Sequence, residues 1–383
     1  MRIILNETSH FGAGCRQELA TELKARGLAK PLVVTDAPLL ACGTAKKVTD
    51  ILDAADIPYA IYSDIKANPT MANVNGCLDA YRTERADCFV AIGGGSVMDT
   101  AKAAAIIAAN PDFADIVSLE GVAPTRHKAK PIFALPTTAG TGAEVTINYV
   151  ITDEHRAKKM VCVDPHDIPV CAIVDAELMA SMPAKLKAAT GMDALTHAIE
   201  GYITKAAWTM TDMFELRAIE LIARFLPRAV ADGNDTEAVE GMALAQYIAA
   251  MGFSNVGLGI VHSMAHPLGA VYDIPHGVAN ALLLPTVMEF NKPAALAKYA
   301  DIAKAMGVEG VASMTPNQAA DAAVEAVRKL AIAVGIPQKL SGLGVPEGGL
   351  EKLSADALAD VCTGGNPREV SQAEILALYR KVY

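Results

Sequence analysis

Two groups of side chains in the second half of the sequence have the types and spacing of metal ligands. Asp193 and His197 lie four residues apart in a segment with helical character, so both side chains leave one face of the helix. Three of the eight histidines, His262, His266 and His276, fall within the segment VHSMAHPLGAVYDIPHG. Carboxylate and imidazole donors without thiolates suit Zn²⁺, Fe²⁺ or a neighbouring divalent metal. The first pair alone is more typical of a surface ion pair or a buried histidine, and it is the second group that favours a metal site.

Spacing alone does not choose the ligands within the second group. His262 and His266 are also four residues apart, so either could face the first pair. Four ligands and one nearby imidazole would combine a Lewis acid with a group that relays protons. The residues therefore predict metal-assisted chemistry but leave the ligand set open.

A glycine-rich turn in the first half has the composition of a phosphate-binding loop. The segment DCFVAIGGGSVMDTAK is a hydrophobic run followed by Gly93, Gly94 and Gly95, and then by Ser96 as the expected N-cap of a helix. Glycines let the backbone approach a phosphate, and a helix start offers unpaired N–H groups and the positive end of the helix dipole. The turn predicts a pyrophosphate site, although a strand-to-helix turn without a ligand has the same composition and the G-x-G-x-x-G fingerprint is absent.

Other polar positions near this turn could contact a dinucleotide. Asp36 ends the run PLVVTD, where a carboxylate could bind an adenosine ribose and repel a 2′-phosphate, which favours NAD over NADP. The alternative is an ordinary turn residue. The loop PTTAGTGAEVTINYV suits phosphate and nicotinamide contacts, although such loops are often only turns. Its polar side chains are Thr137, Thr138, Thr141 and Asn148.

The elements that must position these residues divide the chain in two. In the first half, β-branched runs alternate with Ala- and Leu-rich stretches, which predicts a mostly parallel, Rossmann-like sheet covered on both faces. After Met182 these runs disappear and helical spacing takes over, with Pro183 expected in the first turn of a helix. We expect an α/β dinucleotide-binding domain at 1–182 and an all-helical metal-binding domain at 183–383. The predicted strands are 31–36, 58–63, 87–95 and 131–138.

Composition restricts the possible partners. The chain has 33 basic and 43 acidic residues, a net charge of −10, so its surface repels nucleic acid and anionic lipid. Seven scattered cysteines without a C-x-x-C pair indicate reduced thiols. The N-terminal segment fits no signal peptide, and no apolar run reaches the roughly 18 residues of a membrane span. We expect a soluble cytoplasmic protein with a small-molecule substrate.

Together the motifs resemble the iron-containing, or group III, alcohol dehydrogenases over the whole chain. GGGSVMDTAK resembles the phosphate loop of that family, PTTAGTGAE its second cofactor loop, GMDALTHAIE its first ligand pair and HSMAHPLGAVYDIPHG its second. The resemblance implies a dehydroquinate synthase-like architecture, with an α/β N-terminal domain, an all-α C-terminal domain and the active site in the cleft between them. It also implies a homodimer or a higher homo-oligomer.

The resemblance further implies residue roles. Metal ligands would be Asp193, His197, His262 and His276, with His266 as a catalytic proton relay and with Phe253 and Cys362 in the wall of the substrate pocket. Cofactor contacts would be Asp36, Asn68, Gly94, Gly95, Ser96, Asp99, Thr137, Thr138, Thr141, Asn148 and Lys159.

The implied activity is NAD-dependent oxidation of an alcohol or reduction of an aldehyde. Lactaldehyde and 1,2-propanediol, or a similar short pair, are the expected substrates, with Fe²⁺ as the expected metal and Zn²⁺ as the alternative. Two other hypotheses remain. A non-redox enzyme resembling dehydroquinate synthase would call for several Lys and Arg residues near the metal motifs, where we find few, and a non-catalytic metal-binding protein would need no nucleotide loop.

Overall fold

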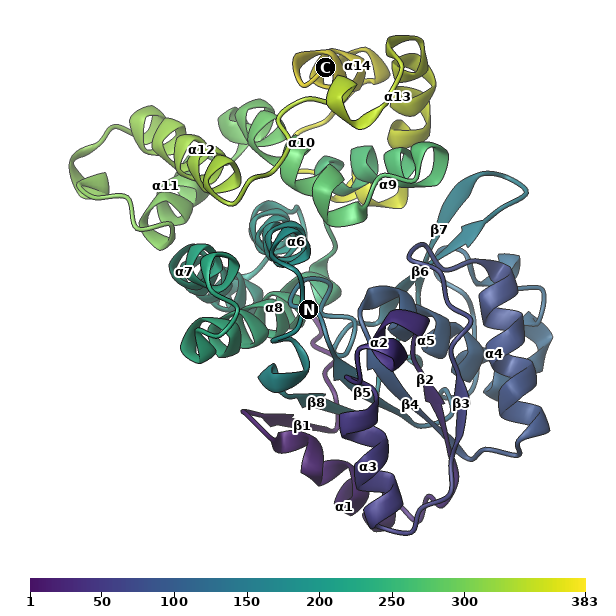
Figure 1. Cartoon of the computed structure of the whole chain (residues 1–383). Helices are drawn as coiled ribbons and strands as arrows, with labels where there is room; N and C mark the ends of the chain where they lie inside the picture. The colour runs from purple at the N-terminus through teal and green to yellow at the C-terminus, as the bar shows by residue number, and fades with distance from the viewer. The chain divides into compact units, whose positions relative to one another are not determined.

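Six parallel strands form the main sheet of the first part of the chain (Figure 1). The computed structural model describes residues 1–383, which form two compact units, Met1–Met182 and Pro183–Tyr383. The strand order is β1-β8-β5-β4-β2-β3, and every neighbouring pair is parallel. The strands are β1 (Thr8–Phe11), β2 (Pro31–Val34), β3 (Ala60–Tyr62), β4 (Cys88–Gly93), β5 (Ile132–Pro136) and β8 (Cys171–Val174).

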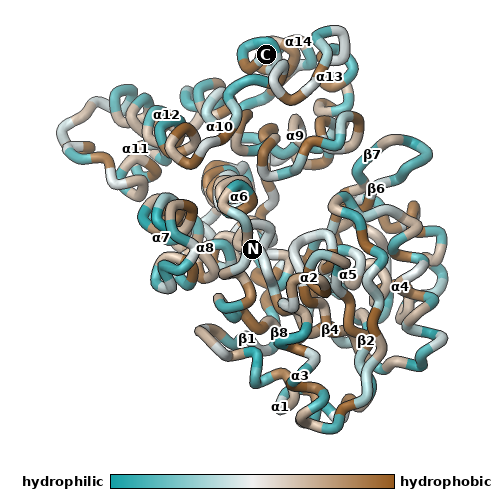
Figure 2. The backbone as a smooth tube through the Cα atoms, viewed as in Figure 1, coloured by the Kyte–Doolittle hydropathy of each residue, from teal (hydrophilic) through white to brown (hydrophobic).

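Helices cover both faces of this sheet. Along β2, Val33 packs with the helices of one face, whereas Leu32 and Val34 pack with those of the other. All residues of β2, β4 and β5 are buried, which explains their nearly continuous hydrophobic runs (Figure 2). The helices are α1 (Glu18–Ala25) and α3 (Lys46–Ala54) on the first face, and α4 (Met71–Thr83) and α5 (Gly95–Ala109) on the second.

The order of the strands creates a switch point beside β2. The chain passes from β2 to its neighbour β3 and then returns to β4 on the opposite side of β2. Loops that leave neighbouring strands in opposite directions open a crevice at the carboxyl ends of those strands. Asp36 follows β2 and the glycine turn at 93–95 follows β4, so both sequence motifs lie beside this switch point.

The structure contains four strands that the sequence patterns did not predict. Two of them, β1 and β8, extend the parallel sheet at one edge. The other two, β6 (Asn148–Asp153) and β7 (Lys158–Val163), form an antiparallel pair that begins at the end of the predicted polar loop 136–150. Burial alternates along β6 between buried and half-buried residues, and a search for continuous hydrophobic runs misses such a strand.

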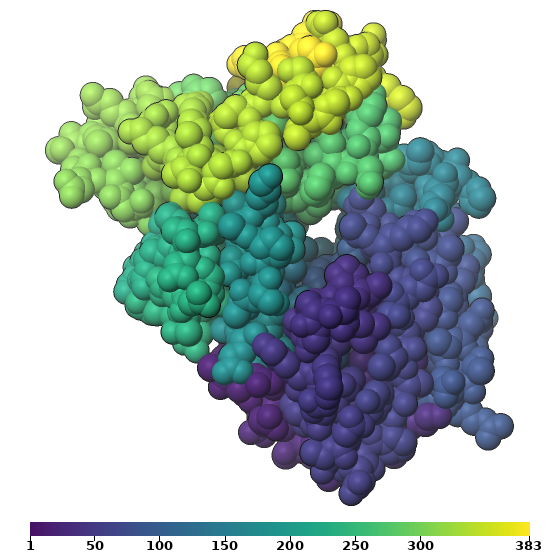
Figure 3. All heavy atoms as spheres, viewed as in Figure 1, coloured from purple at the N-terminus to yellow at the C-terminus, as the bar shows by residue number.

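The second unit contains helices and no β-strand, as its sequence pattern predicts. Most residues of α6 are buried, because α7, α8 and α10 all pack against it. The space-filling view shows closely packed atoms over the visible face of each unit (Figure 3). The helices are α6 (Ala184–Ile203), α7 (Thr209–Ala231), α8 (Thr236–Val256), α9 (Ile260–Tyr272), α10 (His276–Asn291), α11 (Leu296–Ala305), α12 (Pro316–Ala333), α13 (Leu350–Leu358) and α14 (Gln372–Lys381).

Pro183 precedes α6 as its N-cap, one position before the first turn in which we expected it. No single helix is long and apolar enough to cross a membrane. Helices α8 and α9 together pass a test of length and composition, but a bend of 101° separates them.

Helix α7 carries a buried acidic residue that faces two glycines. A Cβ atom at Gly201 of α6 would lie 2.3 Å from Glu215 Oε1, and one at Gly252 of α8 would lie 2.2 Å from it. The two glycines therefore make room for the carboxyl group. Neither carboxyl oxygen has a hydrogen-bond partner in the protein, and burial raises the pKa of Glu215 well above its usual value. Burial therefore favours the neutral form of this carboxyl group.

Candidate active site

Four of the predicted ligands converge in the second unit. The ligand atoms of Asp193, His197, His262 and His276 all lie within 4.8 Å of one another. Helix α6 supplies the first two from successive turns, α9 supplies His262, and His276 is the first residue of α10. His266 lies outside this set, so the fold distinguishes the two histidines of α9 that spacing could not.

A glycine lets α10 approach α6 closely. A Cβ atom at Gly277 would lie 2.5 Å from the carbonyl oxygen of Ala189 and 3.4 Å from Cβ of Asp193. No larger residue fits at this position without moving one of the two backbones. The contact brings His276 Nε2 to 3.7 Å from Asp193 Oδ1.

The four residues line a site that is closed on most sides. Asp193 and His262 are each 2% exposed and His197 is 5% exposed, whereas the side chain of His276 is 26% exposed. The His197 ring stacks on Phe253 of α8, with 4.2 Å between ring centroids, and on the His262 ring, with 4.6 Å. Phe253, which we expected in the pocket wall, therefore supports a ligand ring directly. Access to the site is greatest beside His276.

A buried carboxylate orients His262. Glu200 Oε2 lies 2.6 Å from His262 Nδ1, and Glu200 Oε1 accepts a 2.7 Å hydrogen bond from the Val261 amide. The absence of a side chain at Gly259 makes room for Glu200, because a Cβ there would lie 2.8 Å from Oε1. A carboxylate on Nδ1 turns Nε2 towards the other ligands, an arrangement typical of histidines that bind metals.

Burial governs the ionisation of this pair. It lowers the pKa of His262 to about 3, so the imidazole is neutral, as metal binding requires. Burial also raises the pKa of Glu200 to about 7, against hydrogen bonds from the amides of Val261, Gly259 and His262. The hydrogen between Glu200 and His262 therefore lies between two buried groups, neither of which is readily charged by itself.

Asn280 of α10 shows that the ligand atoms face a common point. Its Nδ2 atom lies 2.7 Å from Asp193 Oδ1 and 3.1 Å from both His262 Nε2 and His276 Nε2. One carboxylate oxygen and two imidazole nitrogens are therefore directed at the same small volume. Together with His197, these donors fit a divalent metal that accepts nitrogen and oxygen ligands.

Sequence reasoning missed Glu200 and Asn280, although a signal for both existed. Glu200 lies three residues after His197 on α6, and Asn280 lies four residues after His276 on α10. Each therefore shares a helix face with a ligand that had been identified.

His266 has a carboxylate partner of its own. Its Nδ1 atom lies 2.8 Å from Asp360 Oδ2, and its ring stacks against that of His276 with 5.5 Å between centroids. Asp360 precedes the short 3₁₀ helix η9 (Val361–Gly365), and its Oδ1 accepts a 2.9 Å hydrogen bond from the Cys362 amide. Burial by itself would raise the pKa of Asp360, but His266 and the Cys362 amide outweigh burial and lower the pKa to about 2. Asp360 is therefore ionised at neutral pH.

In the first unit, the two polar loops lie side by side at the ends of β4 and β5. A Cβ at Gly94 would lie 3.1 Å from the Thr138 side chain, and one at Gly95 would lie 2.8 Å from Thr141 Cγ2. The Thr137 amide donates a 3.0 Å hydrogen bond to the carbonyl of Gly93. The structure thus brings the glycine turn and the threonines of the next loop into one cluster.

Ser96 has a different role from the one we expected. The prediction that it is an N-cap was wrong, because α5 begins at Gly95, with Gly94 as the N-cap and without a side-chain cap. The Ser96 hydroxyl instead donates to the carbonyl of Ala67, next to Asn68, and so ties that segment to the glycine turn. The first amides of α5 have no capping side chain, which suits an anionic ligand such as a phosphate.

Asp36 caps a helix at the end of β2. It is the N-cap of α2 (Ala37–Ala41), and its Oδ1 accepts a 2.9 Å hydrogen bond from the Leu39 amide. The turn role is therefore real. The half-buried carboxylate still lies at the carboxyl end of β2, where a ribose contact requires it.

The remaining cofactor candidates lie around α5 and the β6–β7 pair. Asp99 accepts a 3.0 Å hydrogen bond from the Val150 amide, and desolvation raises the pKa of Asp99 to about 6, against the charges of Lys102 and Lys159. The buried Lys102 donates to the carbonyl of Asn148 at 3.0 Å. Helix α5 therefore holds the start of β6, and with it Asn148, in place.

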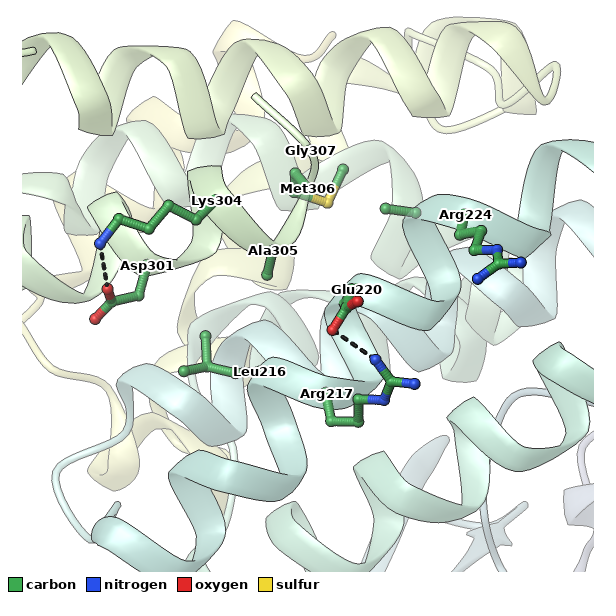
Figure 4. Close-up of a pocket in the computed structure, with 10 residues that line it drawn as sticks. Leu216, Arg217, Glu220, Arg224, Asp301, Lys304, Ala305, Met306 and Gly307 are labelled. Carbon is green, nitrogen blue, oxygen red and sulfur yellow. Dashed lines mark hydrogen bonds and ion pairs between the residues drawn. The ribbon is translucent and has the colours of Figure 1, made fainter. Parts of the chain in front are cut away.

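A depression of about 720 Å³ lies between α7 and α11, away from the metal ligands (Figure 4). Its charged side chains are already paired with each other, Arg217 with Glu220 and Lys304 with Asp301, while Arg224 pairs with an acidic residue of α8. No histidine or cysteine lines it.

A parallel sheet with an uncapped glycine turn and a four-donor metal site define a metal-dependent oxidoreductase that uses a dinucleotide. Residues 6–176 match the iron-containing alcohol dehydrogenases, and residues 187–383 match the C-terminal part of the Fe-containing alcohol dehydrogenase family. The chain belongs to this family, and it is an NAD-dependent alcohol dehydrogenase. The fold class and the family that the sequence motifs predicted are confirmed.

Individual relatives are similar along their whole length. Lactaldehyde reductase of Escherichia coli (strain K12) is 55% identical, with 100% of this chain and 99% of the relative covered. NAD-dependent methanol dehydrogenase of Bacillus methanolicus is 41% identical, with 97% of each chain covered. The crystal structure of a 1,3-propanediol oxidoreductase superimposes with a TM-score of 0.96 at 40% identity, covering 100% of this chain and 99% of the other.

Proposed function

We propose that the protein interconverts lactaldehyde and 1,2-propanediol, or a similar short aldehyde and its alcohol, with NAD(H). The observation that carries the proposal is the convergence of four ligand atoms within 4.8 Å in a buried site. The 55% identity to a lactaldehyde reductase supports the choice of substrate. One methylene or hydroxyl group in an apolar pocket is worth only about 1–3 kcal/mol, so other short aldehydes belong in the test.

Asp193, His197, His262 and His276 would hold one divalent metal. When bound, the metal supplies Lewis-acid polarisation of the substrate oxygen. We propose Fe²⁺, in keeping with the family, and Zn²⁺ as the alternative, because Zn²⁺ normally binds such a donor set more tightly. Elemental analysis of protein purified without added metal, followed by reconstitution with each ion, tests this choice.

His266 would transfer the hydroxyl proton, since Asp360 occupies its Nδ1 and leaves Nε2 available. The NAD would lie along the carboxyl ends of β2, β4 and β5, where the predicted contact residues gather, and Phe253 and Cys362 would limit the substrate pocket. The cofactor contacts proposed are Asp36, Asn68, Gly94, Gly95, Ser96, Asp99, Thr137, Thr138, Thr141, Asn148 and Lys159.

The proposal requires the nucleotide-binding edge of residues 1–182 and the metal site of residues 183–383 to meet, as the family fold implies. We further propose a cytoplasmic enzyme that forms a homodimer or a higher homo-oligomer. Seven free cysteines support the reducing compartment. Light scattering of the purified protein tests the oligomeric state.

The substrate proposal is tested by NADH oxidation at 340 nm with lactaldehyde, acetaldehyde, formaldehyde and 3-hydroxypropanal. We expect the highest kcat/KM with lactaldehyde and metal-dependent activity with the other aldehydes. Preference for a different aldehyde would replace lactaldehyde as the substrate. Absence of NADH oxidation by metal-loaded protein with every aldehyde would refute the proposed function.

A further inference from the structure

Two successive turns of α9 carry two imidazoles, each with its Nδ1 atom on a carboxylate, which is buried for Glu200 and half-buried for Asp360. Glu200 lies 2.6 Å from His262 Nδ1, and Asp360 lies 2.8 Å from His266 Nδ1. The two pairs differ at the opposite nitrogen. His262 Nε2 lies 3.1 Å from the Asn280 amide and belongs to the four-residue cluster around Asp193. His266 is not part of that cluster. The same device therefore orients one ring for metal binding and leaves the other ring for a different task.

We propose that Asp360 is the positioning residue of His266, fixing its ring and the tautomer in which Nδ1 carries a proton and Nε2 exchanges one with the substrate oxygen. This inference rests on the proposed role of His266. In aldehyde reduction, hydride from NADH forms the new C–H bond, the N–H bond at Nε2 breaks and the O–H bond of the alcohol forms. The ring then regains a proton from solvent, so that aldehyde, NADH and one proton give alcohol and NAD⁺.

The second oxygen of Asp360 is held independently of His266. Oδ1 accepts the Cys362 amide at 2.9 Å and lies 3.5 Å from the Ser263 hydroxyl. Thr363 in turn donates a 2.8 Å hydrogen bond to Ser263. The carboxylate therefore cannot turn freely away from the ring. Both members are little exposed, at 7% for the His266 side chain and 10% for that of Asp360, so water does not replace the interaction easily.

A fixed, ionised carboxylate on Nδ1 performs two functions for a proton-transferring imidazole. It excludes the tautomer with the proton on Nε2 and a lone pair on Nδ1, and it stabilises the imidazolium that forms when the ring is doubly protonated. Neither function requires Asp360 to touch the substrate. Asp360 would therefore act entirely through His266.

The decisive variant is Asp360→Asn, which retains size and the N-cap of η9, because Asn caps helices as well as Asp. Its amide group cannot both accept from the Cys362 N–H and accept from His266 Nδ1–H. We expect kcat for lactaldehyde reduction to fall about 100-fold, within the range of general acid–base catalysis, with metal content and KM for NADH unchanged. Asp360→Ser, which also retains a capping oxygen, should give the same loss if Asp360→Asn folds poorly.

A double-mutant cycle separates positioning from a structural effect. In a His266→Ala background, Asp360→Asn should lower kcat less than about threefold further, because the two residues act as one unit. Glu215→Gln, which alters another buried carboxyl of the same unit, should leave kcat unchanged.

If Asp360→Asn had the kcat of the wild type while His266→Ala had a reduced kcat, the inference would be overturned and the proposed role of His266 would remain intact. A full 100-fold loss in the His266→Ala background would also overturn it and indicate a structural role. Full activity of metal-loaded His266→Ala would instead refute the proton relay on which the inference rests. A wild-type protein that oxidises no NADH with any aldehyde would be the separate failure of the proposed function.

Discussion

The substitution Glu200→Gln should weaken metal binding without removing any ligand. Gln has nearly the same shape as Glu, but it carries a donor in place of one acceptor oxygen. Glu200 receives the Val261 amide on one oxygen and the His262 ring on the other. Either orientation of the Gln amide places its NH₂ group against a donor, the Val261 N–H or the His262 Nδ1–H that a metal on Nε2 requires.

The geometry sets the size of the effect. The Glu200–His262 distance is 2.6 Å and both side chains are 2% exposed, so the lost interaction is a short, charge-assisted hydrogen bond without access to water. Such bonds contribute about 1.5–3 kcal/mol, which corresponds to roughly 10- to 100-fold in affinity. Loss of an outer partner of a metal-binding histidine typically costs the same 10- to 100-fold. We therefore expect the metal Kd to rise about 10- to 100-fold.

The assay is competition between metal-free protein and a chromogenic chelator, with Zn²⁺ as the titrant and thermal unfolding measured in parallel. Glu215→Gln is the matched control, since Glu215 is a buried carboxyl of the same helical unit that faces Gly201 and Gly252 and is not one of the four ligands. The metal Kd of this variant should equal that of the wild type. An unchanged Kd for Glu200→Gln in a folded protein would refute the reasoning, because it would mean that the carboxylate does not control the His262 tautomer.

Three further results are expected. His262→Ala should lose bound metal and turnover together, whereas His266→Ala should retain the metal; a metal-replete and active His262→Ala protein would contradict the ligand set, with elemental analysis as the measurement. Asp36→Gly should raise kcat/KM with NADP relative to NAD by at least about tenfold, because it removes a carboxylate that repels a 2′-phosphate. The loss of the helix cap costs only a few tenths of a kcal/mol. An unchanged ratio of the two kcat/KM values would leave Asp36 as a helix cap only. Burial raises the pKa of Glu215 above 4.5, so the stability linked to its proton is complete below about pH 4.5 and decreases as the pH rises. In the wild type, the free energy of unfolding should decrease by up to about 1.4 kcal/mol per pH unit, and Glu215→Gln should remove this decrease. Urea unfolding between about pH 5 and 8 measures it. An equal dependence of the unfolding free energy on pH in both proteins would show that Glu215 is ionised in the folded state.

Local sequence patterns were sufficient to predict the elements whose structure depends on a single segment of the chain. The buried strands β2, β4 and β5 are recognisable in the sequence as continuous hydrophobic runs, because both of their faces are covered. The glycine turn was recognisable from its three consecutive glycines, and the structure gives a reason for Gly95, where a Cβ would lie 2.8 Å from Thr141 Cγ2. Strand β6 was missed because its residues alternate between buried and half-buried, without a continuous hydrophobic run. The N-cap at Ser96 was wrong because the helix already begins at Gly95, with Gly94 as its N-cap.

The sequence by itself determined the class of fold and the expectation of reduced cysteines. It also showed two segments that carry ligands, about 65 residues apart. Only the tertiary structure decided which atoms of those segments meet. Helical spacing treats His262 and His266 alike, because it describes one helix at a time. The packing of α6 and α10 against α9 directs His262 Nε2 to Asp193 and His276, and it places Asp360, almost 100 residues further along the chain, on His266. Contacts between distant segments depend on how the helices pack, and no local pattern contains that information.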